Sequence, residues 1–176
     1  KMPLLEVVVA KKTAPWAVAT VRAFGVAQGK TVIVVKDGPG FYTTRILGPF
    51  INEAVVLLDE GVAIPALDAA LLDFGFPVGP VALLDEVGID VAAHVSKDLG
   101  KAFAARGAAP SGTFTKLFDA GYRGRKNAKG FYLYPKGRPS GVSKEVNPEV
   151  YAFFGGASRR TMAPEDLVDR LALDDG

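Results

Sequence analysis

A single glutamate lies inside an otherwise apolar stretch near the start of the chain. Glu6 interrupts the run Leu4-Leu5-Glu6-Val7-Val8-Val9. An ionised carboxylate is costly to bury, so Glu6 needs a partner or a raised pKa. A carboxylate in that setting could orient a histidine for general acid–base chemistry. The alternative is a glutamate that faces solvent or pairs with Lys11 or Lys12.

The one histidine of the chain, His94, lies in a segment predicted to be helical. The acids nearest to it in the sequence are Asp90 and Asp98, one turn to either side. A lone helical histidine is typically structural, so we do not assign His94 to catalysis. With one histidine and no cysteine, the sequence excludes a His-rich metal site, a thiolate nucleophile and disulfides, and we expect no metal.

The segment 116–138 is strongly basic, with one acid, Asp119, among its charged residues. Its glycines would let the backbone approach a ligand closely, and its cations could meet the phosphates of a nucleotide or of coenzyme A. The alternative is a solvated loop. We expect Phe131, Tyr132 and Tyr134 to anchor the segment on the core. The basic residues are Lys116, Arg123, Arg125, Lys126, Lys129, Lys136 and Arg138.

The length and composition are typical of a globular chain and do not indicate binding to nucleic acid or insertion into a membrane. The 176 residues are 49% hydrophobic and 23% charged, which fits one domain or one domain and part of a second. The net charge of +2 is too small to argue for nucleic acid. No apolar run reaches the roughly 18 residues that a membrane span requires. Neither a G-x-G-x-x-G nor a Walker motif is present.

The elements that would position Glu6 form a β-α-β unit. The runs 4–9 and 31–35 are apolar on both alternating faces, which is typical of strands inside a covered parallel sheet. Between them we predict a helix that Thr13 caps, with Pro15 in its first turn, and that extends to about Gln28. Two strands alone cannot bury such faces, so we expect the sequence to be a fragment of a longer protein.

After Asp37-Gly38-Pro39-Gly40 the pattern becomes helical. A helix over about 45–60 has a polar stripe of roughly 120°, which also holds Val56, and is predicted to be buried on its other sides, with Gly61 ending it. Shorter helices are predicted at about 65–74, 80–87, 89–106 and 113–120, and a last one begins after Ala163 at Pro164. Loops are predicted at 110–112 and 135–141. The polar stripe consists of Arg45, Asn52, Glu53, Asp59 and Glu60.

Taken together, these segments resemble the 3-hydroxyacyl-CoA dehydrogenases, and specifically the multifunctional α-subunits of fatty acid β-oxidation of the trifunctional-enzyme type. The matching motifs keep the order of that family over about 130 residues, and residues 140–160 carry the least information. They are Met2-Pro3-Leu4-Leu5-Glu6-Val7-Val8, Lys36-Asp37-Gly38-Pro39-Gly40-Phe41-Tyr42-Thr43-Thr44-Arg45, Asn52-Glu53-Ala54, Gly75-Phe76-Pro77-Val78-Gly79-Pro80 with Leu83-Leu84-Asp85, Gly88-Ile89-Asp90-Val91, and Gly124-Arg125-Lys126-Asn127-Ala128-Lys129-Gly130-Phe131-Tyr132.

The resemblance implies a mainly α fold. Residues 1–37 would be the last β-α-β of a Rossmann domain that binds NAD, incomplete in this sequence. Residues 38–140 would be an all-helical domain of the type found at the C-terminus of 3-hydroxyacyl-CoA and 6-phosphogluconate dehydrogenases, which carries substrate contacts and dimerisation. Residues 141–176 would be a linker and the truncated first helix of a second copy of that domain.

The chemistry implied is the oxidation of a 3-hydroxyacyl-CoA to a 3-ketoacyl-CoA, with hydride transfer to NAD⁺. In the family a histidine takes the hydroxyl proton and a glutamate orients and stabilises the imidazolium, and Glu6 stands at the position of that glutamate. The histidine would precede Lys1, as would the dinucleotide-binding glycines. We therefore expect the fragment to be inactive alone.

Further site residues follow from the resemblance. Thr44 occupies a position beside the substrate where many relatives have asparagine, and its hydroxyl offers fewer donors than an amide. Lys126 matches a lysine that reaches the cofactor. Phe76, Val78, Gly79 and Pro80 would form a turn near the acyl-chain cleft, and packing between helices is an equal alternative for these four.

The partners implied are an acyl-CoA substrate and, in the longer protein, a homodimer mate or a thiolase β-subunit, with no nucleic acid and no membrane span. A bacterial cytoplasm is favoured over a mitochondrion. Two other functions stay open. The chain could be a non-catalytic association module, or it could belong to a dehydrogenase of the same plan that acts on another hydroxy acid.

Overall fold

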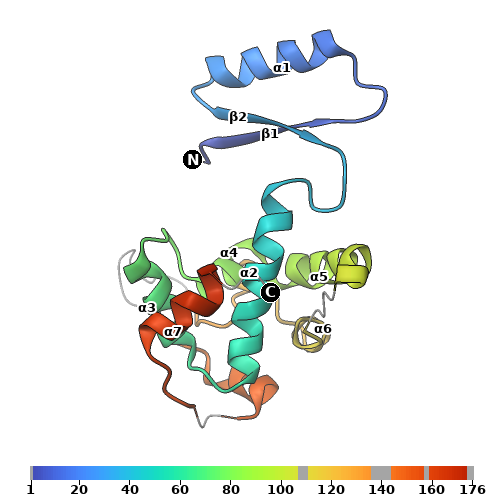
Figure 1. Cartoon of the computed structure of the whole chain (residues 1–176). Coiled ribbons are helices and arrows are strands. Elements are labelled where there is room, and N and C mark those ends of the chain that lie inside the picture. The colour runs from blue at the N-terminus through green and yellow to red at the C-terminus, as the bar shows by residue number, and fades with distance from the viewer. Residues whose placement is uncertain (1, 107–110, 136–143, 157–158, 174–176) are drawn as a thin grey trace. The chain divides into compact units, whose positions relative to one another are not determined.

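A computed structural model describes residues 2–106, 111–135, 144–156 and 159–173, and these residues fall into two compact units, 1–47 and 48–176. The long helix α2 (Thr43–Asp59) begins in the first unit and continues into the second. The predicted fold class is confirmed, because a small parallel sheet with one helix is followed by a helical unit (Figure 1).

The first unit is the predicted β-α-β. Strands β1 (Leu4–Val9) and β2 (Thr31–Lys36) pair in parallel with Glu6 opposite Ile33, and α1 (Pro15–Ala27) covers one face of the pair (Figure 1). Gly25 lets α1 approach the sheet, since a Cβ there would collide with Leu5 and Val32. The capping prediction was wrong in detail. Ala14 precedes the helix without a side-chain bond, and Thr13 accepts from the Ala10 N–H instead.

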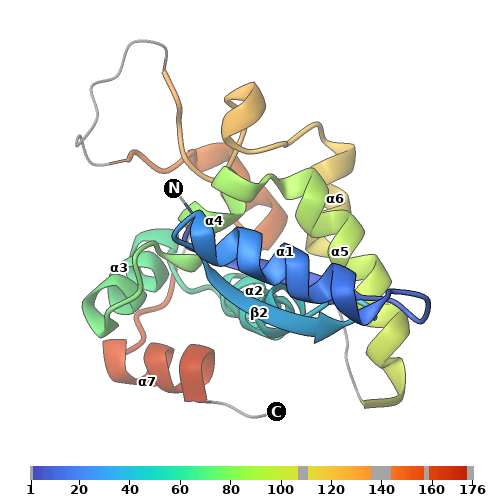
Figure 2. The ribbon, with the colours of Figure 1, turned by 90° about the horizontal axis from the view of Figure 1, so that it is seen from above.

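The second unit is built around the C-terminal part of α2. Four more α-helices surround it within the described residues before the last segment of the chain. They are α3 (Ile64–Phe74), α4 (Pro80–Val87), α5 (Ile89–Phe103), which a 3₁₀ turn extends to Arg106, and α6 (Thr113–Asp119). Short 3₁₀ turns cover Arg125–Asn127 and Pro148–Phe154. Helix α5 packs beside α6 (Figure 2).

Helix α2 partly contradicts the buried-on-most-sides prediction. Ala54, Val55, Leu57 and Leu58 are fully buried, but Ile46 and Leu47 are 54% and 40% exposed.

The polar residues of α2 form hydrogen bonds and ion pairs with other parts of the protein. Asn52 and Asp59 accept from Ser111, and Asp59 also accepts from the Thr113 hydroxyl. Arg170 forms ion pairs with Glu53 and Glu60.

The segment after residue 144 completes the core of this unit. Helix α7 (Pro164–Val168) begins at the predicted proline, continues as a π-helical turn over Asp169–Leu173 and packs beside α3 (Figure 2). Val150, Phe154, Leu167 and Leu171 are buried in the same cluster as α2 and α3. The predicted loop 135–141 lies outside the described residues except for Pro135.

Candidate active site

The Glu6 carboxylate is bound by the first residues of α2. Its Oε1 accepts the backbone N–H groups of Tyr42 at 2.9 Å and Thr43 at 3.0 Å, and its Oε2 accepts the Thr43 hydroxyl at 2.9 Å. The backbone makes this possible just before the helix, where Gly40 and Phe41 both adopt positive φ, +72° and +46°, and turn the following N–H groups toward β1. Glu6 is thus half-buried and engaged through both oxygens, and its partners are Tyr42 and Thr43 rather than Lys11 or Lys12.

These donors keep Glu6 charged. The hydrogen bond from the Thr43 backbone lowers the pKa of Glu6 below its ordinary value, burial opposes it, and the Thr43 hydroxyl and the Tyr42 backbone add to the lowering. A carboxylate that accepts several hydrogen bonds from a helix N-terminus is stabilised in its ionised form. Glu6 therefore meets the electrostatic requirement for a group that orients and stabilises a cationic imidazole.

Thr44, the predicted substrate residue, is the next residue of α2 after Thr43. It is half-buried and lies in the same unit as Glu6, but its hydroxyl takes no part in the Glu6 contact. The residue that binds Glu6 is Thr43, which sequence reasoning missed. The available signal was a hydroxyl residue just before the predicted helix, where backbone N–H groups have no partner within the helix.

The turn at Phe76, Val78, Gly79 and Pro80 lies in the second unit, between α3 and α4. The Phe76 ring stacks on Phe50 with centroids 5.3 Å apart, and Pro80 starts α4. Val78 and Gly79 line an open cavity of about 330 Å³. Leu72, Asp68, Tyr132 and Lys144 are among the other residues around this cavity. The turn therefore serves helix packing through Phe76 and borders an open space through Val78 and Gly79.

Asp68 holds that turn in place. Its two oxygens accept the N–H groups of Val81 at 2.8 Å and Ala82 at 3.0 Å, in the first turn of α4. The Tyr132 hydroxyl donates to the same carboxylate at 2.6 Å. Burial raises the pKa of Asp68, and these donors act in the opposite direction. All of these donors belong to the protein, so Asp68 is a structural carboxylate.

Asp85 holds the basic segment in place through hydrogen bonds, as Asp68 does for the turn. It accepts the N–H groups of Phe131 and Tyr132 and the hydroxyl of Tyr134, each at 2.9 Å. Phe131 and Tyr132 are buried, which confirms that these aromatics anchor the segment on the core. Sequence reasoning placed Asp85 within a family motif and assigned it no role. An acid between apolar residues, the signal that singled out Glu6, was present at Asp68 too, whereas Asp85 follows Leu84 but precedes Glu86.

Four cations of the basic segment make contacts within the protein, namely Arg123, Arg125, Lys126 and Lys129. Lys126 lies 2.6 Å from Asp90, and its side chain is 45% exposed. Arg125 pairs with Glu86, Arg123 lies over the Phe118 ring, and Lys129 donates to the Ala120 carbonyl. These contacts favour a structural role for most of the segment. Lys136 and Arg138 lie outside the described residues.

His94 has structural contacts, as expected. Its Nδ1 lies 2.6 Å from the carbonyl oxygen of Asp90, one turn earlier in α5, and its ring packs edge-on against Phe118 at 5.5 Å. Within the described residues no three His, Asp or Glu side chains gather as candidate metal ligands. None of the helices in the described part of the chain has the length and hydrophobicity that a membrane crossing requires.

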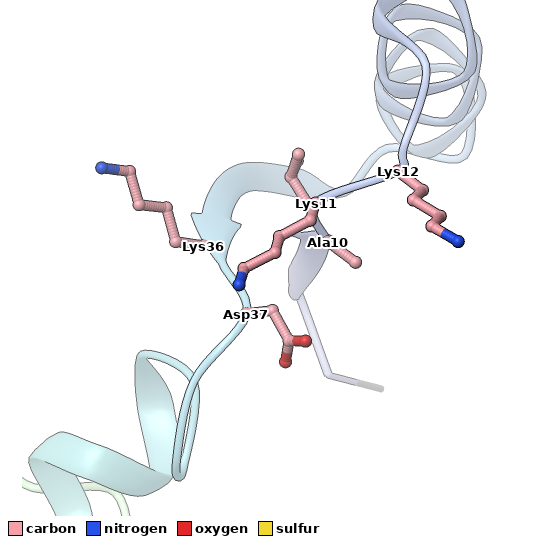
Figure 3. Close-up of a pocket in the computed structure, with 6 residues that line it drawn as sticks. Ala10, Lys11, Lys12, Lys36 and Asp37 are labelled. Carbon is pink, nitrogen blue, oxygen red and sulfur yellow. The ribbon is translucent and has the colours of Figure 1, made fainter.

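A second open cavity, of about 660 Å³, lies where β1 and β2 end, and Val9, Ala10, Lys11, Lys12, Lys36 and Asp37 line it. The amino group of Lys11 lies on the side of Asp37, whereas Lys12 and Lys36 point in other directions (Figure 3). The three ammonium groups do not converge, so the cavity does not form a built anion site.

The structure therefore divides the predicted site residues between the two units. Glu6 and Thr44 belong to the first. The turn 76–80 and Lys126 belong to the second, where Lys126 contacts Asp90 rather than any residue of the turn. The ion pair of Lys126 with Asp90 forms between residues of the protein and requires no ligand.

Comparison with known proteins gives two family matches. The profile described as "3-hydroxyacyl-CoA dehydrogenase, C-terminal domain" matches residues 40–134, and the one described as "3-hydroxyacyl-CoA dehydrogenase, NAD binding domain" matches residues 1–38. The chain is 54% identical to the fatty acid oxidation complex subunit alpha of Shewanella amazonensis over 155 residues, 88% of this chain and 22% of that protein. With the Shewanella baltica subunit it shares 52% over 186 residues, 100% of this chain and 26% of that protein. The chain thus spans about a quarter of the length of these relatives.

Solved structures show the same likeness. The (S)-3-hydroxybutyryl-CoA dehydrogenase of Ralstonia eutropha aligns with a TM-score of 0.70 at 37% identity, over 77% of this chain and 48% of its own. The 3-hydroxybutyryl-CoA dehydrogenase of Escherichia coli aligns with a TM-score of 0.69 at 35% identity, over 80% of this chain and 30% of its own. The dehydrogenase part of a multifunctional enzyme from C. elegans, at 22% identity and a TM-score of 0.65, shares the fold over 97% of this chain and 38% of its own.

Proposed function

Because the chain belongs to the 3-hydroxyacyl-CoA dehydrogenase family, we propose that it forms part of a longer enzyme that oxidises a 3-hydroxyacyl-CoA to the 3-ketoacyl-CoA in fatty acid β-oxidation. Oxidation removes a proton from the hydroxyl and a hydride from the carbinol carbon, so the reaction needs a base for the proton and, when bound, NAD⁺ would accept the hydride. The two Shewanella relatives are bacterial fatty acid oxidation complex subunits, which supports this pathway and a bacterial cytoplasmic location.

The observation that carries the proposal is the state of Glu6. Three donors from the start of α2 fix its carboxylate and lower its pKa, so it is ionised at neutral pH. An ionised carboxylate raises the basicity of an imidazole beside it and stabilises the imidazolium after proton transfer. His94 is engaged with α5, so we place the base outside these 176 residues, as the resemblance implies.

Substrate and cofactor contacts are proposed for residues of both units. Thr44 would hydrogen-bond the substrate through its hydroxyl, and Phe76, Val78, Gly79 and Pro80 would border the acyl chain. NAD supplies the hydride acceptor when bound. Lys126 is the residue of this chain that we assign to it, and its exposed ammonium could leave Asp90, because a surface ion pair is worth only about 0.5 kcal/mol.

The proposal is tested in the longer dehydrogenase by Glu6→Gln, with 3-hydroxyacyl-CoA-dependent NADH formation as the readout. We expect kcat to fall about 100-fold or more, with little change in KM, because the amide cannot stabilise the imidazolium. Glu165→Gln, at an exposed glutamate of α7, is the control and should keep the parental rate. A Glu6→Gln enzyme with normal turnover would reject the assignment.

Association in the longer protein, as a homodimer or with a thiolase β-subunit, is supported by exposed apolar side chains on the second unit. Leu72 and Phe74 on α3 are 48% and 53% exposed, and Val87 and Val91 are 51% and 41% exposed. Sedimentation of the longer protein, with and without Phe74→Glu, tests this. The same molar mass for both proteins would remove Phe74 from any interface.

A further inference from the structure

Two of the three donors to Glu6 belong to one residue. Thr43 contributes its backbone N–H at 3.0 Å and its hydroxyl at 2.9 Å, and Tyr42 contributes one N–H at 2.9 Å. We propose that Thr43 is a positioning residue of the dehydrogenase, whose hydroxyl fixes the plane of the Glu6 carboxylate. The inference rests on the proposed function, in which Glu6 orients the catalytic base.

The distribution of the donors gives the hydroxyl this role. Both backbone N–H groups meet Oε1, whereas Oε2 receives the Thr43 hydroxyl. Bonds to one oxygen locate that oxygen but leave the carboxylate free to rotate about it. The bond to the second oxygen sets the plane. Oε1 already accepts two bonds, but Oε2 accepts one and can take a second, so the held group still has capacity for an imidazole N–H.

Neutral donors, rather than cations, account for the charge state of Glu6. The lowering of its pKa comes from hydrogen bonds of Thr43 and Tyr42 against the effect of burial. Arg45, in the first turn of α2, donates to the Pro39 carbonyl. Lys30, after α1, donates to the Met2 carbonyl. The remaining charged side chains on the surrounding elements are Lys11 and Lys12 after β1, Arg22 on α1, and Lys36 and Asp37 at the end of β2.

The hydroxyl can be removed with little change of shape. Thr43→Val keeps the β-branched side chain and the backbone N–H, and Thr43→Ser keeps the hydroxyl. In the longer dehydrogenase we expect Thr43→Val to lower kcat about tenfold, with the KM for the acyl-CoA unchanged. The reason is that a misoriented carboxylate stabilises the transition state less well but does not change substrate binding. Thr43→Ser should restore most of the rate. The matched control is Thr20→Val, which removes a hydroxyl bonded within α1.

A second measurement does not depend on activity. Carbon-13 NMR of the glutamate carboxyl groups in the 176-residue chain, with Glu6 assigned through Glu6→Gln, follows the ionisation of Glu6 directly. Thr43→Val should raise the pKa of Glu6 relative to the parent chain, and Thr43→Ser should not. An unchanged Glu6 titration in Thr43→Val would overturn the inference.

The two proposals fail in different ways. If Glu6→Gln leaves the longer enzyme active, the proposed function is wrong, whatever Thr43 does. If Glu6→Gln is inactive while Thr43→Val keeps the parental kcat, only the positioning role of Thr43 is lost. If Thr43→Val and Thr43→Ser lose kcat equally, the hydroxyl is not the determining group.

Discussion

The hydroxyl of Tyr132 lies 2.6 Å from a carboxylate oxygen of Asp68, although 64 positions separate the two residues. Through this bond the basic segment is tied to α3, and through its other bonds Asp68 holds the first turn of α4. Asp85 binds the same segment from α4. Two buried carboxylates therefore fix the surroundings of the turn 75–80 and of Lys126.

Loss of the Asp85 charge should be strongly destabilising. Asp85→Asn keeps the shape but replaces one acceptor oxygen by a donor that faces N–H or O–H groups. The free energy of unfolding should fall by about 3 kcal/mol, since a buried donor is left without an acceptor. Urea denaturation measures it. Asp73→Asn, at an exposed position of α3, should change stability little. Equal effects of both would contradict a structural role for Asp85.

Buried Asp68 should make stability depend on pH. Burial raises the pKa of Asp68 in the folded chain, so the folded state holds this proton more tightly than the unfolded state. Its contribution is complete below the unfolded aspartate value, about 3.9, and is lost as pH rises through the raised folded value. The stability advantage of the parent chain over Asp68→Asn should therefore shrink as the pH rises above about 4. An advantage that grows would mean that the hydrogen bonds outweigh burial.

A side chain at Gly79 should disturb Asp68. A Cβ on Gly79 would collide with the side-chain and backbone atoms of Asp68, although φ at Gly79 is an ordinary −70°. Gly79→Ala should lower the free energy of unfolding by about 1–3 kcal/mol. Gly112→Ala is the matched control, because a Cβ at Gly112 meets no atom within 4 Å and its φ is −67°. Thermal unfolding of both variants makes the comparison. Tolerance of alanine at Gly79 would show that Asp68 can move.

Shortening Leu167 should show that α7 belongs to the core of the second unit. Leu167 is 1% exposed, so Leu167→Ala should cost about 2–5 kcal/mol of unfolding free energy. Leu72→Ala, at a side chain that is 48% exposed, removes the same atoms and should cost much less. Denaturant titrations give both values. A small loss at Leu167 would mean that α7 contributes little to the fold.

The parts of the fold that depend on local pattern could be predicted from the sequence. Pro164, Pro80 and the apolar runs placed α7, α4 and both strands within a residue or two. The exposure of Ile46 and Leu47 could not, because a helical wheel shows which residues share a face but not what covers that face. The Thr13 cap failed because its hydroxyl had a second partner close by, the Ala10 N–H.

The functional site, like the fold, could be predicted only where it depends on local sequence. The burial cost of a charge singled out Glu6 from the sequence alone, since that cost depends only on the residue and its neighbours along the chain. The contact of Glu6 with Thr43 spans 37 positions and depends on the turn at Gly40 and Phe41. The roles of Asp68 and Asp85 rest on partners 13 to 64 positions away. No local spacing encodes such distances, so these roles emerge only from the folded chain.

The buried positions of Leu167 and Leu171 show that the stretch matched by the family profile is shorter than the stretch that folds together. Likeness to the family's C-terminal domain stops at residue 134, yet Val150, Phe154, Leu167 and Leu171 lie in the same apolar cluster as α2 and α3. A recombinant piece that ends at residue 134 would lack these four side chains, so the apolar cluster of α2 and α3 would be exposed to water and to other copies of the piece. The boundary of a folded piece is therefore better chosen by where the buried side chains end than by where the family profile ends.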